Sequence, residues 1–91
     1  MIELHLFKDA YGGEVTREEY VEGEVWHREG SPALRVSSGL EAWYRQGKLH
    51  REDGPAIHDQ ASGYKAWFLE GVVQRVEHAS GVIFEVTPAH P

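Results

Sequence analysis

Two short strings of the sequence carry the side chains best suited to chemistry, a histidine followed by an arginine and a glutamate. The strings are His27-Arg28-Glu29 and His50-Arg51-Glu52. A histidine near a carboxylate can act as a general base, and a neutral imidazole is a common ligand of zinc. The alternative is structural, because polar side chains in loops often bond the loop backbone. The two strings recur in matching sequence contexts, which favours the structural role.

The expected spacing of the two histidines argues against a shared metal ion. If each repeated unit contributes two strands, His27 and His50 lie roughly 9–10 Å apart. A zinc ion holds each nitrogen ligand at about 2.0–2.1 Å, so a single ion cannot bridge that distance. The chain also contains no cysteine, which excludes a disulfide, a thiolate metal site and a cysteine nucleophile. We therefore expect no catalytic residue, no metal site and no cofactor.

The elements that position these strings follow from an internal repeat of the sequence. Segments 27–33 and 50–56 share His, Arg, Glu, Pro and Ala, and their histidines match with a shift of 23 residues. Further along, the shift becomes 24, and the matching pairs are Ser38-Gly39 with Ser62-Gly63 and Ala42-Trp43 with Ala66-Trp67. The weaker matches at the ends are Tyr20 with Tyr44, Gly23 with Gly47, and Arg75 with Arg51. Degenerate end units are typical of repeat proteins, whose terminal units must face water.

Each unit has the pattern of strands joined by tight turns. Residues 40–45 and 64–69 are aromatic-rich runs of strand length, and glycine-containing turns flank them on both sides. Alternating apolar residues near both ends of the chain predict further strands at 2–6, 72–76 and 82–86. The expected fold class is all-β, an antiparallel sheet of tandem β-hairpin repeats with capping N- and C-terminal strands.

The length of the chain is that of a single domain over residues 1–91. Within it we expect an N-terminal cap strand and the start of an acidic segment over 1–18, and hairpin repeats over 19–71. A closing hairpin over 72–87 and a tail over 88–91 complete the expected organisation.

The sequence from Trp43 to Ala56 resembles a known repeat family. It reads Trp-Tyr-Arg-Gln-Gly-Lys-Leu-His-Arg-Glu-Asp-Gly-Pro-Ala, which is similar to the W-Y-x-x-G-K-x-H-R-x-D-G-P-A variant of MORN-like repeats. Such repeats occur in small phage, bacterial and large-virus proteins and in antitoxins of the YwqK type. The resemblance covers about residues 27–71 and implies stacked β-hairpins that bind a protein or a membrane surface without catalysis. It specifies the fold unit rather than the function, because functional sites are grafted onto folds.

The charge of the chain points to a basic partner rather than to nucleic acid. The formal net charge is −6, from 15 acidic and nine basic residues, whereas binding to a phosphate backbone requires clustered Lys and Arg. Six glutamates gather in one segment: Glu14, Glu18, Glu19, Glu22, Glu24 and Glu29. This segment is either a solvated face or a patch that steers the domain to a basic surface, such as the nucleic-acid-binding channel of another protein.

Trp43 and Trp67 are the other candidates for partner binding. Period-two alternation places both rings on the face opposite Ala42 and Ala66, with charged residues beside each ring. Such rings either pack in a core or form an exposed aromatic anchor for a partner. The predicted partner-binding residues are Glu14, Glu18, Glu19, Glu22, Glu24, Trp43 and Trp67.

These features together predict a non-catalytic protein that binds and inhibits a larger protein. A phage inhibitor of a bacterial defence nucleoprotein complex, of the anti-CRISPR type, is the concrete form, and an antitoxin that caps a toxin is the neighbouring form. The alternative class is a repeat protein that forms homo-oligomers or joins a virion or membrane complex, because sheet edges invite pairing. The sequence shows neither a signal-peptide pattern nor an apolar run of about 20 residues. We therefore expect no transmembrane segment and a cytoplasmic location, in the host cell if a phage encodes the protein.

Overall fold

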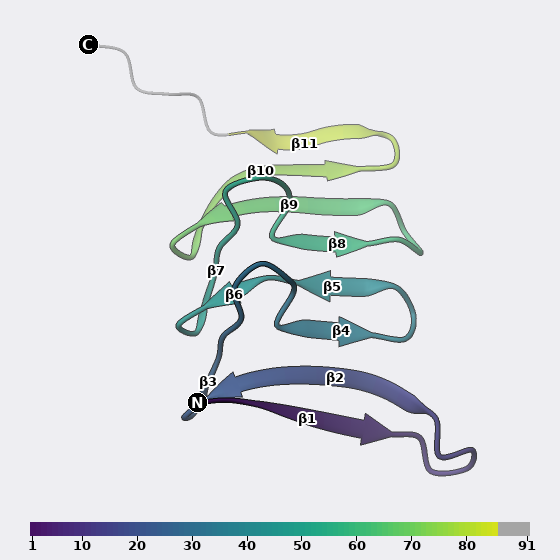
Figure 1. Ribbon diagram of the computed structural model, residues 1–91. Helices are drawn as coiled ribbons and strands as arrows, with labels where there is room; N and C mark the ends of the chain where they lie inside the picture. Colours follow the sequence, from purple (N-terminus) through teal and green to yellow (C-terminus); the bar gives the residue numbers. More distant parts are fainter. Residues whose placement is uncertain (86–91) are drawn as a thin grey trace.

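The computed structural model describes residues 1–85, which contain eleven β-strands joined by turns and loops (Figure 1). The strands are β1 (Ile2–Lys8), β2 (Val15–Glu22), β3 (Val25–Trp26), β4 (Leu34–Val36), β5 (Leu40–Ala42), β6 (Tyr44–Arg45), β7 (Lys48–Leu49), β8 (Ile57–Asp59), β9 (Tyr64–Leu69), β10 (Val72–His78) and β11 (Gly81–Glu85). Every strand pair is antiparallel. No helix occurs within these 85 residues, and so none that could span a membrane. The expected all-β antiparallel class is confirmed.

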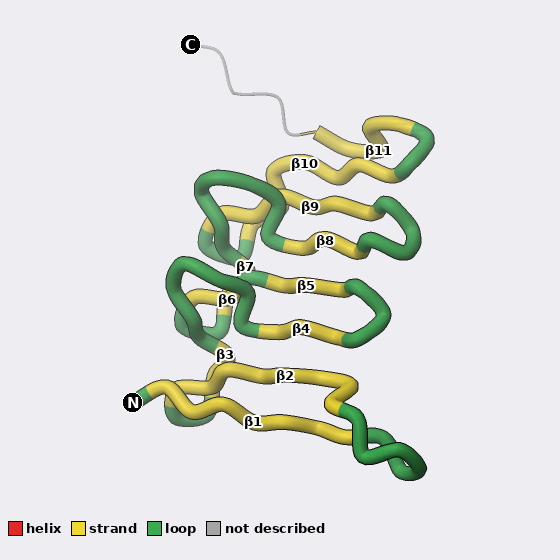
Figure 2. The backbone as a smooth tube through the Cα atoms, turned by 45° about the vertical axis from the view of Figure 1, so that its right-hand side comes forward, coloured by secondary structure: helices red, strands yellow, loops and turns green. Residues whose placement is uncertain are grey.

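One large sheet runs the length of the domain (Figures 1 and 2). Its strand order is β1-β2-β4-β5-β8-β9-β10-β11, and β3 also pairs with β2. Strands β6 and β7 form a separate two-stranded hairpin. Figure 2 shows that the loops after β3 and β7 fold back beside the sheet before the chain re-enters it at β4 and β8. Successive strands of the chain are therefore added to the same end of the sheet, with a loop beside the sheet between β3 and β4 and another between β7 and β8.

The two ends of the chain occupy the two ends of this sheet. Strand β1 falls within the segment 1–18 expected as a cap and pairs with β2 over its whole length. Strands β10 and β11 pair within the segment expected as a closing hairpin. The last residues of that segment, 86 and 87, and the expected tail 88–91 lie outside the described residues.

Tight turns at matching places fix the hairpins. The turn between β6 and β7 has Gln46 and Gly47 at its centre, with φ values of 52° and 80°. The turn between β9 and β10 has Glu70 and Gly71 there, with φ values of 49° and 81°. Positive φ at both central residues matches the twist of paired strands, and glycine tolerates it because it lacks a Cβ. The glycine turns expected after residues 45 and 69 are therefore confirmed.

Backbone hydrogen bonds correct one detail of the sequence repeat. The Tyr20 N–H donates to Ala33 O at 2.8 Å, as the Trp43 N–H does to Ala56 O at 2.6 Å. Tyr20 thus occupies the place of Trp43, whereas the sequence comparison matched it with Tyr44. The match of Tyr20 with Tyr44 was wrong by one residue because it aligned Gly23 with Gly47. Gly23 is the first central residue of the turn between Glu22 and Val25, whereas Gly47 is the second central residue of its own turn.

The most buried side chains of the described residues are small. Ala33, Ala56 and Ala66 are completely buried and Ala42 is 4% exposed, while none of the large side chains is fully buried. Three of the four, Ala42, Ala56 and Ala66, lie in or next to the central strands β5, β8 and β9. Complete or nearly complete burial of these methyl groups means that little space is left around them for a larger side chain.

This packing predicts that enlarging one alanine destabilises the domain. Ala56→Leu should lower the free energy of unfolding by about 1–3 kcal/mol, because extra methylene groups in a filled site force side chains and backbone apart. Urea denaturation followed by tryptophan fluorescence measures this. The control is Ala61→Leu, at an exposed turn residue, and equal stability of the two variants would contradict the packing account.

Candidate functional site

One face of the large sheet carries a row of charged and polar residues that lie directly opposite one another on neighbouring strands. We call this row the charge ladder; it consists of Glu18, Arg35, Glu41, His58, Lys65 and Glu77. Directly opposite residues of an antiparallel pair have Cβ atoms about 4.5–5.5 Å apart, so opposite charges in these positions attract. The ladder contains acids and bases in similar number, so it largely neutralises itself and does not account for the negative excess of the chain.

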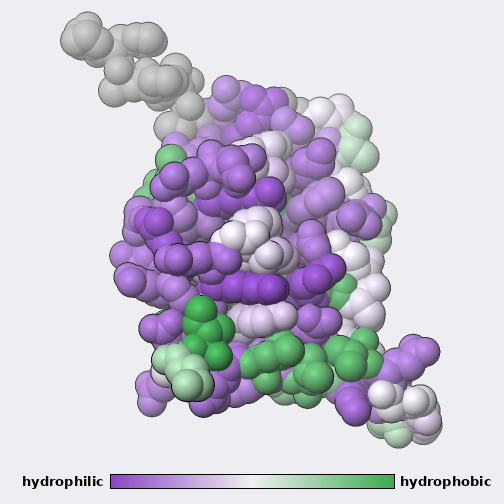
Figure 3. Space-filling view, in the orientation of Figure 1, coloured by the Kyte–Doolittle hydropathy of each residue, from purple (hydrophilic) through white to green (hydrophobic). Residues whose placement is uncertain are grey.

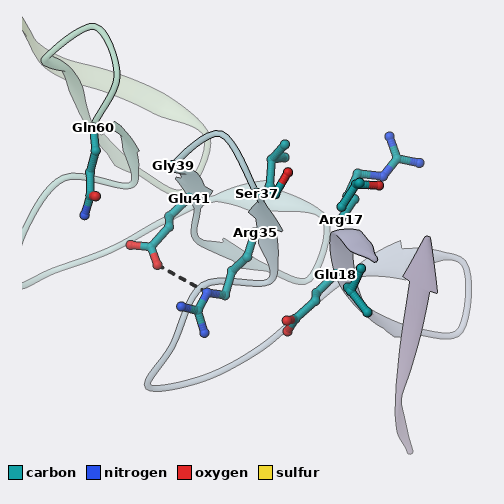
Figure 4. A pocket seen from close by; sticks show the side chains of 10 residues that line it. Arg17, Glu18, Arg35, Ser37, Gly39, Glu41 and Gln60 are labelled. Atoms are coloured by element: carbon teal, nitrogen blue, oxygen red, sulfur yellow. Dashed lines mark ion pairs between the residues drawn. The ribbon is translucent and has the colours of Figure 1, made fainter. Parts of the chain in front are cut away.

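A pocket of about 330 Å³ lies at one end of the ladder. Its charged lining residues are Arg17, Glu18, Arg35 and Glu41. Figure 4 shows the Arg35 guanidinium between the carboxylates of Glu18 and Glu41, and its Nε lies 3.3 Å from Glu41 Oε2. The pocket therefore presents paired charges of both signs, which suits polar contacts with a partner surface.

A row of aromatic residues runs beside the charge ladder. Tyr20, Trp43 and Trp67 each follow a ladder residue by two positions, which places them on the same face of the sheet. We call these three residues the aromatic row. All three are half-buried, and an arginine lies over each ring. The distances from guanidinium carbon to ring centroid are 3.8 Å for Arg28 over Tyr20, 3.8 Å for Arg51 over Trp43 and 5.6 Å for Arg75 over Trp67.

The loops after β3 and β7 hold two of these arginines in place. Arg28 donates from Nη1 to Pro32 O at 3.3 Å, and Arg51 donates from Nη1 to Pro55 O at 3.2 Å. Each guanidinium is thus stacked on a ring and bonded to its own loop. A cation over an aromatic face contributes about 0.5–1 kcal/mol at exposed sites and more when water is excluded. The loops and the aromatic row therefore stabilise each other.

The two histidines of the His-Arg-Glu strings hold neighbouring turns. His27 Nδ1 accepts a hydrogen bond of 2.8 Å from the Gln46 N–H, and His50 Nδ1 accepts one of 2.9 Å from the Glu70 N–H. An Nδ1 that accepts from a backbone amide carries no proton, so the geometry assigns the neutral tautomer with its proton on Nε2. The imidazoles thus bond the backbone of the next turn. Among residues 1–85, no three His, Asp or Glu side chains converge as a metal would require.

A second cleft, of about 400 Å³, opens between the two His-Arg-Glu loops. Its lining residues are Arg28, Glu29, Gly30, Trp43, Arg45, His50, Arg51, Glu52 and Asp53. Arg51 donates from Nε to Asp53 at 3.0 Å, so part of this charge is paired inside the loop. The cleft gives a partner access to the indole of Trp43 between groups of both signs.

Two ionisable groups near this cleft have shifted pKa values. A hydrogen bond from the Arg45 guanidinium, together with its positive charge, holds the pKa of Glu70 below the usual 4.5. Burial raises the pKa of the Tyr44 hydroxyl above its usual 10.0, because the charged form loses solvation. The Tyr44 ring also packs edge-on against Trp26, with centroids 4.8 Å apart.

The structure spreads the predicted acidic residues along β2. Glu14 is exposed before the strand, Glu18 belongs to the charge ladder, and Glu22 and Glu24 are exposed at the far end. Glu14 and Glu22 are eight residues apart, which corresponds to about 26 Å in an extended strand. The acids therefore form a line along the strand rather than a compact patch.

Glu19 differs from the other predicted acids because it is only 8% exposed. Its Oε1 accepts a hydrogen bond of 3.2 Å from the Trp26 Nε1–H, and its Oε2 lies 2.9 Å from Arg17 Nε. The side chain alternates with Glu18 and so points to the other face of the sheet. Glu19 stabilises the fold in this position and is not available to a partner.

The arginines of the site were absent from the residues predicted from sequence, although a signal for them exists. Each aromatic residue precedes its arginine by eight positions: Tyr20 and Arg28, Trp43 and Arg51, Trp67 and Arg75. The spacing survives although Tyr replaces Trp in the first pair. Trp43 and Trp67 were predicted as partner-binding residues, and the structure places them in one row with Tyr20. The sequence repeat was used to predict the rings but not the arginines that lie over them.

No family model, no curated protein and no solved structure matches this chain.

The histidine contacts predict that His50→Ala destabilises the domain. The change leaves the Glu70 N–H without its acceptor and empties the space of a side chain that is 9% exposed. The expected loss is about 1–3 kcal/mol of the free energy of unfolding, measured by urea denaturation. His78→Ala, at an exposed position of β10, should change stability by less than about 0.5 kcal/mol. Equal effects at positions 50 and 78 would contradict the role of the imidazole.

The Arg45 contact predicts a measurable shift in the titration of Glu70. In Arg45→Gln the pKa of Glu70 should rise towards 4.5, because the hydrogen bond and the positive charge that lower it are gone. In the native chain this pair stabilises the fold above the unfolded pKa, and its contribution is lost as pH falls through the lower folded pKa. NMR titration of the Glu70 carboxyl carbon measures the pKa of Glu70 in the native chain and in Arg45→Gln. Arg35→Gln serves as the control, and an unchanged Glu70 titration in Arg45→Gln would refute the assignment.

Proposed function

We propose that this domain is a non-catalytic binding protein that inhibits a larger protein by covering part of its surface. The observation that carries this proposal is the aromatic row with its stacked arginines. Aromatic residues and arginine are the side chains most enriched at the energetic centres of protein interfaces. Here three such pairs lie on one sheet face, with every ring half-buried, and two of the arginines are bonded to their own loops. A preordered surface loses little conformational entropy on binding.

The charge of the exposed groups favours a partner with a basic surface. Glu14, Glu22 and Glu24 are exposed along and beyond β2, and the chain carries a net charge of −6. Such a field speeds the encounter with a positive surface and fixes its orientation. A nucleic-acid-binding channel of another protein is the partner surface that we propose, because carboxylates spaced along a strand can stand where phosphates would lie.

The scaffold that supports this function is, in our proposal, a tandem repeat of MORN-like β-hairpins. Residues 23 or 24 positions apart make the same contacts: the histidine to the next turn, the arginine to its ring, and the loop arginine to the proline carbonyl. These contacts involve the residues that carry the resemblance to that family. The phage inhibitor of a bacterial defence nucleoprotein remains the concrete form of the proposal, acting in the cytoplasm, and it rests on this resemblance and the charge pattern.

The test is the loss of partner binding in variants of each surface. The immobilised domain is used to recover its partner from a cell lysate, and affinity is then measured with the purified partner over a range of salt concentrations. Trp43→Ala and Trp67→Ala should each weaken binding by about tenfold or more. Replacing Glu14, Glu22 and Glu24 together by Gln should slow association and flatten its salt dependence.

Matched variants separate these effects from general damage. Tyr11→Ala removes a fully exposed ring away from the aromatic row, and replacing Ala10, Ala61 and Val72 by Lys makes the same change in net charge at exposed positions outside the proposed surfaces. Circular dichroism verifies that every variant is folded. Absence of any protein retained at micromolar concentration, or equal affinity of all variants, would overturn the proposed function.

A further inference from the structure

The outer edge of β1 has the features of a strand that accepts another strand. The sheet order begins with β1, so one side of its backbone pairs with β2 and no strand of residues 1–85 covers the other side. Natural edge strands usually avoid pairing by shortness, by lysine and other charged side chains, by proline or by bulges. Strand β1 has seven residues and no proline, and both its one lysine and its one irregularity, between Phe7 and Lys8, fall at its end. Within residues 1–85, the outer side of segment 2–7 is therefore regular and unpaired.

One side of this edge strand is apolar and exposed. Ile2, Leu4 and Leu6 are 41%, 47% and 49% exposed, and their alternation places them on the same face. Figure 3 shows apolar side chains gathered along β1, in contrast to the hydrophilic surface over the strands above it. Single exposed apolar residues are common, but a row of them beside unpaired backbone groups marks an interaction surface.

We propose that β1 pairs with β1 of a second copy of this chain. The two strands run antiparallel about a two-fold axis at Leu4, and the two large sheets continue into one. In this register Leu4 lies opposite Leu4, and Ile2 lies opposite Leu6. Such an interface is isologous, because the same patch of both copies forms it.

The sequence of β1 selects this register and this occupant. On the other face of the strand, the Leu4-centred register places Glu3 opposite His5 in both halves of the pair. Glu3 Oε2 already lies 3.3 Å from His5 Nε2 within one strand, so these groups share a face and attract. A shift of the axis to position 3 places two Glu3 carboxylates opposite each other, and a shift to position 5 places Ile2 opposite Lys8. The strand is thus its own complement in the register centred on Leu4.

Dimerisation through β1 is independent of the proposed inhibitory function. Trp43, just after β5, and Trp67, in β9, lie several strands away from the edge that the dimer would cover, whereas Tyr20 on β2 lies directly opposite Leu4. The dimer would present two aromatic rows, one from each copy.

Disulfide trapping tests the register directly, because the chain contains no cysteine of its own. Directly opposite residues have Cα atoms about 4.5–5.5 Å apart, a distance that a disulfide can bridge. Under mild oxidation Leu4→Cys should form a covalent dimer by itself. Ile2→Cys and Leu6→Cys should do so only when mixed with each other. Val72→Cys, at an exposed apolar position of β10, is the control.

Sedimentation measures the association without a covalent bond. The mass of the native chain should rise with concentration from 10.3 kDa towards twice that value. Leu4→Lys should shift this transition to at least tenfold higher concentration, whereas Val72→Lys should not. Glu3→Lys and His5→Glu should each weaken association, and the double variant should restore it because Lys and Glu again face each other across the pair.

Three results would overturn the proposal. One is a constant mass of 10.3 kDa up to about 1 mM, a concentration at which even weak pairing is detected. Another is cross-linking of Leu4→Cys no faster than that of Val72→Cys, or self-cross-linking of Leu6→Cys instead. The last is a monomeric chain in which Leu4→Lys abolishes capture of a different protein, since the edge would then serve that protein. Loss of partner binding in the aromatic-row variants has no bearing on any of these outcomes.

Discussion

The hydrogen bond from a turn amide to a histidine Nδ1 holds the successive steps of this sheet together. The amide belongs to the residue that opens the next turn, Gln46 or Glu70, and that residue has a positive φ that a non-glycine side chain disfavours. The imidazole supplies an acceptor that fixes the strained turn against the loop before it. The same loop brings Ala33 or Ala56 to the sheet, where each is completely buried. Histidine, turn and alanine therefore act as one packing element.

The proposed binding surface depends on this packing. The residue after each histidine is an arginine, and the loop that the histidine fixes carries that arginine over Tyr20 or Trp43. The guanidinium is bonded to a proline carbonyl of its own loop, so the ring below it is held in one orientation. The His-Arg-Glu strings thus place their arginines over two rings of the aromatic row. Rigid aromatic and guanidinium groups bind other proteins well because little entropy is lost.

The small core leaves many apolar side chains exposed on the surface. Among the described residues only alanines form the most buried apolar positions, and large apolar side chains such as Leu4, Leu6 and Val72 stay exposed. A short domain buries a limited share of the surface that its unfolded chain exposes. Among residues 1–85, the outer edge of β1 and the half-buried aromatic row are two places where further burial is available. The proposed dimer and the proposed partner each use one of them.

The sequence by itself determined the class of fold and the positions of its turns. Period-two alternation and recurring glycine are local properties, so the antiparallel strands and the turns at Gly47 and Gly71 could be predicted from neighbouring residues alone. The tryptophans and the acids could be named, but not their surroundings. Only the tertiary structure showed that Glu19 turns inward to Trp26 and Arg17, and that Tyr20 occupies the place of Trp43. It also decided that arginines eight positions beyond the rings return to cover them. These facts depend on which strands and loops become neighbours in space. The spacing of eight residues between ring and arginine recurs in the sequence, but the spacing alone does not say that the two side chains meet.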